Sequence, residues 1–199
     1  MRLGRLANRL LSSTFALALM SAAPLHMMAQ DDHPHASTTL TAEQKAQQSA
    51  LINIVRQATE KYKDVRVAEH DGYKLQFGCV SGDTSGAMGL HFVNGDIVNN
   101  GVINPYRPQI VIYEPAADGH LQLIGADFLV FADAWDKNNS GPPELMGQLF
   151  HLFSAPNRFL LPSFYTLHVW AWKDNPNGAF VNWHPNVNCE QFGGEKTVP

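Results

Sequence analysis

The sequence predicts an α+β domain in which a long N-terminal amphipathic helix packs on a curved, mostly antiparallel sheet. Three observations support this fold class: an early run of apolar residues at helical spacing, strand-like apolar runs after Gly72, and an Asp-Gly turn between the two strongest runs. About 170 residues follow the leader segment described below, which is the length of one domain. We therefore expect a single core made of helix and sheet layers.

The predicted helix covers Ala42 to Lys63. Thr41 and Gln44 form a capping-box pattern, in which a hydroxyl and an amide each satisfy a backbone N–H at the helix start. The residues that follow at helical spacing form one apolar stripe: Leu51, Ile54, Val55, Ala58 and Tyr62. A short second helical turn is expected around Val65 to Glu69.

The strands are expected after Asp71-Gly72. A hairpin is indicated by Asp118-Gly119, because glycine supplies the positive φ that such a loop needs. The two hairpin strands are apolar at both alternating positions, which is typical of strands covered on both faces. The helix would cover one face, and loops, a barrel-like curl or another copy of the chain would cover the other. The expected strands are Lys74–Val80, Met88–Val93, Gln109–Glu114, His120–Ala132, Leu149–Phe153 and Phe164–Trp172.

The first 29 residues have the layout of a secretory signal peptide. Arg2, Arg5 and Arg9 precede an apolar run over residues 10–25 that is too short and too interrupted for a convincing membrane span. The expected organisation is a signal peptide over 1–29, a mobile polar segment over 30–40 and one α+β domain over 41–199. This layout predicts a secreted or periplasmic protein that is not membrane-bound after leader removal, and a retained uncleaved anchor is the alternative.

Charge and cysteine content narrow the class further. The chain has 14 basic and 18 acidic residues and a net charge of −4, and loss of the leader arginines makes it more acidic. This balance argues against nucleic acid as a partner. Cys79 and Cys189 are the two cysteines, and an even count in an exported protein predicts one disulfide, with two separate buried thiols as the alternative.

Three histidines lie within predicted strands among apolar neighbours: His91, His151 and His168. An imidazole at a strand centre is costly to bury without a partner. If the three converge, they could bind a divalent metal such as zinc or copper and leave one coordination position open. The further ligand would be Asp127, which lies on an apolar strand face, or Glu114.

A simpler interpretation remains for each of these groups. A core histidine often hydrogen-bonds a backbone carbonyl or a nearby acid. Arg107 and Asp127 could form a plain buried ion pair. The strand aromatics, including Trp170, are more often core than a cofactor site. Arg158 could bind a carboxylate from its loop, and His184 is expected to make a surface contact.

Three sequence blocks resemble a group of exported bacterial proteins of unknown function. These blocks are GCVSG at 78–82, GAMGLHFVN at 86–94 and FHLFSAPNRFLLPSFYTLHVWAWKDNPNGAF at 150–180. The resemblance implies a secreted or periplasmic single domain and implies no activity. It also implies that His91, His151 and His168 belong to the recurring blocks of the group, whereas His33, His120 and His184 are peculiar to this chain.

Three functional hypotheses follow. The first is a binding module that holds a metal ion or a small-molecule ligand through the strand histidines. The second is a hydrolase or lyase with a histidine base oriented by Asp127 or Glu114. The third is a structural or stress-response protein whose sheet packs into a homo-oligomer.

Overall fold

The computed structural model describes residues 40–194 and 196–197, which form one compact unit. The predicted signal peptide and most of the 30–40 segment lie outside the described residues. Within the described part of the chain, no helix has the length and apolarity needed to span a membrane.

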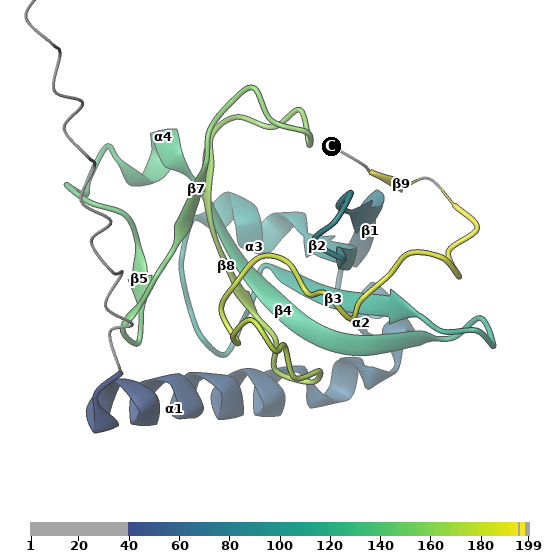
Figure 1. Ribbon diagram of the computed structural model, residues 1–199. Coiled ribbons are helices and arrows are strands. Elements are labelled where there is room, and N and C mark those ends of the chain that lie inside the picture. The colour runs from purple at the N-terminus through teal and green to yellow at the C-terminus, as the bar shows by residue number, and fades with distance from the viewer. Residues whose placement is uncertain (1–39, 195, 198–199) are drawn as a thin grey trace, which may run out of the picture. The chain divides into compact units, whose positions relative to one another are not determined.

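The described residues form a seven-stranded sheet that curls into a half-barrel (Figure 1). Its order is β7-β8-β4-β3-β2-β1-β9, and every neighbouring pair is antiparallel except the short parallel contact of β9 with β1. The predicted α+β class with a curved, mostly antiparallel sheet is confirmed. The strands are β1 (Tyr73–Ser81), β2 (Ala87–Asn94), β3 (Ile110–Pro115), β4 (Leu121–Phe131), β7 (His151–Phe153), β8 (Phe164–Val169) and β9 (Lys196–Thr197).

The helical elements are short except for the first. They are α1 (Ala42–Thr59), the 3-10 helix η1 (Glu60–Lys63), α2 (Val65–His70), α3 (Gly95–Asn100) and α4 (Ala132–Trp135). The capping box at Thr41 is present, with both of its hydrogen bonds. The prediction of one long amphipathic α-helix to Lys63 is not supported, because the α-helical geometry ends at Thr59 and few α1 side chains are fully buried.

Helix α1 packs on the face of the sheet that is opposite the histidines. Leu51 and Val55 are fully buried in a cluster with Phe128 of β4 and with Leu167 and Val169 of β8. Because successive side chains of a strand alternate between faces, Asp127 and His168 must point to the other side of the same strands. The concave inner face of the curl therefore carries the polar groups.

A β-bulge in β1 reshapes that inner face. The pairing of β1 with β2 jumps from Gln76 opposite His91 to Cys79 opposite Leu90, so Phe77 and Gly78 are extra residues. Both have a φ of 63°. Such a bulge bends the strand and redirects a side chain, and Phe77 lines the cavity on the inner side of the sheet.

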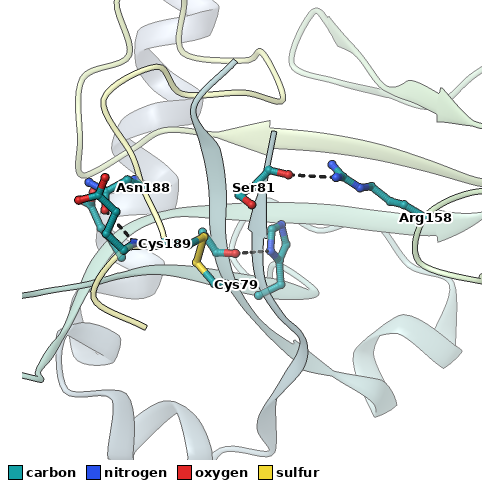
Figure 2. The surroundings of a disulfide bond; sticks show 9 residues. Cys79, Ser81, Arg158, Asn188 and Cys189 are labelled. Atoms are coloured by element: carbon teal, nitrogen blue, oxygen red, sulfur yellow. Dashed lines mark hydrogen bonds between the residues drawn. A yellow bond between two sulfur atoms is a disulfide. The ribbon is translucent and has the colours of Figure 1, made fainter. Parts of the chain in front are cut away.

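The predicted disulfide is present between Cys79 and Cys189, which are 110 residues apart in sequence (Figure 2). It ties the C-terminal segment to β1 directly after the bulge. The same region is held from a second side, because Arg158 Nη2 donates a hydrogen bond of 2.9 Å to the Ser81 carbonyl. Its guanidinium lies 5.2 Å from the Trp183 ring, so Arg158 anchors the β7–β8 loop.

Three local predictions differ from the structure. The residues after Asn94, for which the sequence predicts no helix, form α3, because the Asn94 side chain accepts a hydrogen bond from the Ile97 N–H and caps the helix. The predicted strand over 149–153 is divided: β6 (Gln148–Leu149) pairs with β5 (Glu144–Leu145) in a second sheet, and β7 joins the main one. Strand β8 ends at Val169, since the Trp170 N–H bonds to Ala179 outside the sheet.

Candidate metal centre

Three buried polar side chains meet on the inner face of the sheet: His91 of β2, Asp127 of β4 and His168 of β8. Their relative exposures are 6%, 3% and 2%. One ligand atom from each can be chosen so that all three lie within 4.8 Å of one another. Asp127 and His168 are direct cross-strand partners, whereas His91 reaches them across β3. The sheet curl is what brings β2 close enough.

The imidazoles face each other through Nε2 atoms that are 3.3 Å apart. His91 Nδ1 lies 3.3 Å from the Gly89 carbonyl, to which it can only donate. The neutral His91 ring therefore presents a lone pair at Nε2. His168 Nδ1 lies 3.8 Å from Asp127 Oδ1, beyond hydrogen-bond distance, and finds no hydrogen-bond partner among the described residues.

Two proton arrangements are open to His168. With its proton on Nε2, it bonds to His91, but its Nδ1 lone pair then faces the Asp127 oxygen. With its proton on Nδ1, it faces the carboxylate favourably, but two Nε2 lone pairs then oppose each other at 3.3 Å. Only a cation between the nitrogens satisfies the second arrangement. Two nitrogens about 2.05 Å from a tetrahedral metal are themselves separated by about 3.3 Å.

Burial sets the protonation states of the three groups. Loss of water lowers the pKa of His91 from 6.5 to about 4 and that of His168 from 6.5 to about 3. Burial also raises the pKa of Asp127 from 3.8 to about 6, against the opposing effect of the 2.5 Å hydrogen bond that Thr166 donates to it. At neutral pH both imidazoles are uncharged, which is the state that binds metals.

The three side chains form the polar end of a small, mainly apolar cavity of about 30 Å³. A cavity of this size holds about one water-sized group. Its walls include Phe77 and Met88 on one side and Leu129, Phe159 and Phe164 on the other. The polar end could thus hold an ion and one small additional ligand atom.

Two of the five predicted site residues lie elsewhere. His151 of β7 is exposed, and its Nδ1 contacts Asn182 Oδ1 at 3.1 Å. The Glu114 carboxylate accepts hydrogen bonds from Lys173 Nζ at 2.5 Å and from the Asn188 N–H at 3.4 Å. The structure therefore brings His91, His168 and Asp127 together, and it does not bring His151 or Glu114 to them.

Other predictions about single residues also need correction. Asp127 accepts a hydrogen bond from Thr166, and among the described residues it forms no ion pair with Arg107, which is exposed. His184 is fully buried, not a surface contact, because its Nε2 donates to the Asp174 carbonyl and its Nδ1 accepts from the Asn186 N–H. Its hydrogen bonds are complete, in contrast to those of His168.

Thr166 also belongs to the site, through its hydrogen bond to Asp127, and was not predicted from the sequence. Thr166 precedes His168 by two residues and therefore shares its face of β8, a signal that strand alternation provides. The Gly89 carbonyl was also missed. It becomes available because Gly89 has a φ of +88°, a conformation that side-chain-bearing residues rarely adopt.

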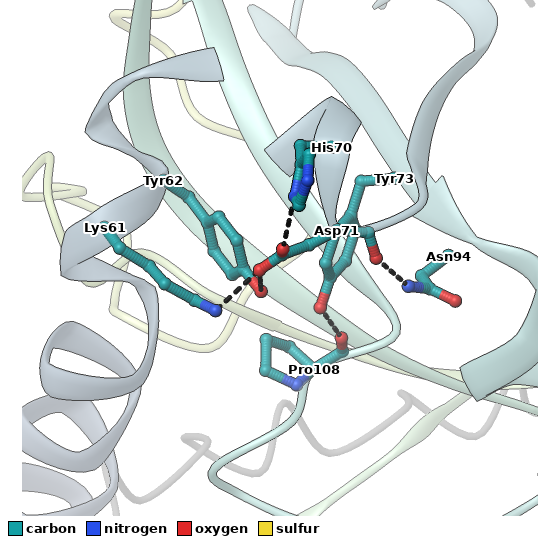
Figure 3. Close-up of polar contacts among 7 residues, drawn as sticks. All are labelled: Lys61, Tyr62, His70, Asp71, Tyr73, Asn94 and Pro108. Atoms are coloured by element: carbon teal, nitrogen blue, oxygen red, sulfur yellow. Dashed lines mark hydrogen bonds and ion pairs between the residues drawn. The ribbon is translucent and has the colours of Figure 1, made fainter. Parts of the chain in front are cut away.

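A second polar cluster surrounds Asp71 (Figure 3), and its bonding is different. The Asp71 carboxylate accepts hydrogen bonds from Lys61, Tyr62 and His70, and its carbonyl accepts one from Asn94. The hydrogen bond from Lys61 is the largest influence that lowers the Asp71 pKa to about 2. This satisfied network joins η1 and α2 to the sheet, so we assign it a structural role.

Comparisons with protein-family models, with curated proteins and with solved structures give no match. The functional argument therefore depends on the geometry of the site.

Proposed function

We propose that this protein is an exported domain that binds one divalent metal ion through His91, His168 and Asp127. The observation that carries the proposal is the pair of facing Nε2 atoms 3.3 Å apart, with His91 Nδ1 committed to the Gly89 carbonyl. In metal sites, the ring nitrogen of a histidine ligand that does not bind the metal commonly donates its N–H to a backbone carbonyl, which fixes the ring orientation. The buried, partnerless His168 Nδ1 is a cost that a metal-bound arrangement would help to offset.

The donor set favours a transition metal over calcium or magnesium, because two imidazoles are nitrogen donors. Zinc and copper both suit this set, and two histidines with one carboxylate also suit iron(II). Three protein ligands leave at least one position open, which is typical of sites that act on a ligand and not of closed structural sites.

The experiment is metal analysis of purified protein and its variants. We expect the wild-type domain to bind one zinc or copper ion per chain, and His168→Gln and His91→Gln to bind at least about tenfold more weakly. His120→Gln is the matched control, because this histidine lies in the exposed loop between β3 and β4, outside the cluster, and should leave the affinity unchanged. Wild-type protein that refuses added zinc, copper and iron(II) would contradict the proposal, as would an equal loss in the control.

A second candidate is a hydrolase or lyase in which His168 is the base and Asp127 its orienting acid. The contact of 3.8 Å between His168 Nδ1 and Asp127 Oδ1 favours it, since catalytic hydrogen bonds are often long before substrate binds. Hydrolysis of p-nitrophenyl esters by EDTA-treated protein, lost in His168→Gln and kept in His120→Gln, would support this candidate. No metal-free turnover would leave the binding site as the better proposal.

The predicted homo-oligomer also stays a proposal. Leu149 and Leu152 are 57% and 53% exposed next to or within the edge strand β7. Sedimentation of the purified domain tests this, and a strictly monomeric species would exclude it.

A further inference from the structure

The cavity beside His91, Asp127 and His168, here the inner cavity, shares part of its wall with a larger one, here the outer cavity, which is lined in part by Gln76 and Phe77 of β1. The outer cavity has a volume of about 520 Å³, within the range of small-molecule sites, which is about 300–1,000 Å³. The two cavities share four wall residues: Phe77, Ile110, Leu129 and Leu161. A molecule in the outer cavity would therefore contact apolar side chains that also line the inner cavity beside His91, Asp127 and His168.

The two cavities differ in chemistry. The inner one ends at His91, Asp127 and His168 and admits about one small group. The outer one has an apolar side that includes Val98 and Phe131, and its rim carries Lys74 and Asp96. A ligand that fills both needs one small polar head and a longer apolar body.

The charge of the metal site determines which polar head group the ligand should carry. A divalent ion held by two neutral imidazoles and one carboxylate keeps a net charge of +1 in a buried site. An uncompensated buried charge is unfavourable, and a single anionic ligand at an open coordination position would neutralise it. A neutral head such as an alcohol would leave the excess charge in place.

We propose that the site binds a medium-chain aliphatic monocarboxylate, with its carboxylate on the metal and its chain in the outer cavity. This inference rests on the proposed function, because the metal supplies the charge that selects the head group. The apolar body is placed by the Phe77, Leu129 and Leu161 walls that both cavities share.

The opposite orientation is a distinct outcome. Lys74 is exposed at the outer rim and could hold a carboxylate with the chain pointing inward. Binding in that orientation would not need the metal and would weaken in Lys74→Gln. Binding in the proposed orientation would need the metal and would be nearly unaffected by Lys74→Gln.

The test titrates zinc and then octanoate into the purified domain, each step followed separately by calorimetry. After zinc has bound, we expect octanoate to bind at least about tenfold more tightly than octanol or than octanoate added with EDTA. Shortening the acid from octanoate to hexanoate and butanoate should weaken binding by up to about fourfold per methylene removed.

Adjacent leucines provide the matched variants. Leu161 lines both cavities, whereas Leu160 is 92% exposed and lines neither. Leu161→Gln should weaken octanoate binding while zinc binding is retained, and Leu160→Gln should change neither. If Leu161→Gln does not fold, Phe131→Gln replaces it, since Phe131 lines the outer cavity and not the inner one.

The two steps separate the two proposals. Zinc binding followed by no octanoate binding, by equal binding with and without zinc, or by equal effects of Leu160→Gln and Leu161→Gln would overturn the ligand inference and leave the metal site standing. Failure to bind zinc, copper and iron(II) at the first step would overturn both.

Discussion

Replacement of Asp127 by Asn should stabilise the metal-free protein, although it removes a site residue. Burial raises the pKa of this carboxyl from 3.8 to about 6. The ionised form is therefore disfavoured in the fold at pH 7 by about 3 kcal/mol, at about 1.4 kcal/mol for each pH unit between the two values. Asn removes that charge, keeps an oxygen that can accept the Thr166 hydrogen bond and offers an N–H toward His168 Nδ1.

The pH dependence of this burial cost sets the sign of the expected difference in stability. An acid whose folded pKa is raised carries its full cost above pH 6. The cost shrinks between pH 6 and 3.8 as the folded carboxyl takes up a proton, and it is absent below 3.8. In EDTA at pH 7, the free energy of unfolding of Asp127→Asn should therefore exceed that of the wild type by up to about 3 kcal/mol. The difference should fall toward zero near pH 4.

Urea unfolding at both pH values measures this difference. Zinc should narrow this difference at pH 7, because a ligand at 100 times its Kd stabilises the wild type by about 2.7 kcal/mol and the variant by less. A metal-free Asp127→Asn protein that is less stable than wild type at pH 7 would refute the reasoning. It would mean that the charged carboxylate is fully compensated in the apo fold.

Three further predictions concern the surroundings of the site. The metal-free protein should lose stability as the pH falls from 6.5 toward 4. The two buried imidazoles of the cluster have lowered pKa values in the folded state, so the unfolded chain takes up their protons first. Because the raised pKa of Asp127 acts in the opposite direction, urea unfolding should show a net loss of about 1.4 kcal/mol per pH unit below 6. Gly89→Ala should lower the free energy of unfolding by about 2 kcal/mol or more, since φ is +88° and a Cβ would lie 2.6 Å from the Tyr113 carbonyl oxygen. Gly95→Ala is the control, because a Cβ there meets open space, and it should be close to neutral in thermal melts of both variants. Removal of the Cys79–Cys189 bond should cost up to about 5 kcal/mol for a loop of 110 residues, and equal melting of oxidised and reduced protein would contradict this.

Local patterns predicted the elements whose signals are themselves local. The capping box at Thr41, the hairpin around Asp118-Gly119 and the alternating strand residues depend on near neighbours in sequence. The end of α1 at Thr59 and the capped helix after Asn94 were missed. In both cases the apolar spacing is compatible with more than one backbone geometry, and local hydrogen bonds decide between them.

The candidate site was predicted only in part, because local patterns identify polar residues on apolar strands but not which of them meet. His91, His168 and Asp127 were singled out as polar residues on apolar strands, and nothing in the sequence separated them from His151 and Glu114. His151 lies on the edge strand β7, where its side chain reaches water. Glu114 lies near the end of β3 and pairs with Lys173, which follows β8.

The sequence by itself determined the α+β class, the positions of the main strands along the chain, the disulfide partners and the polar residues that burial would make costly. Only the tertiary structure decided which of those residues meet. The distance between β2 and β8 depends on the curl of the sheet across β3 and β4, to which strand twist and the irregular pairing of β3 with β4 at Ile112/Tyr113 contribute. The facing nitrogens and the cavity beside them are products of that curvature, to which residues far apart in the chain contribute together.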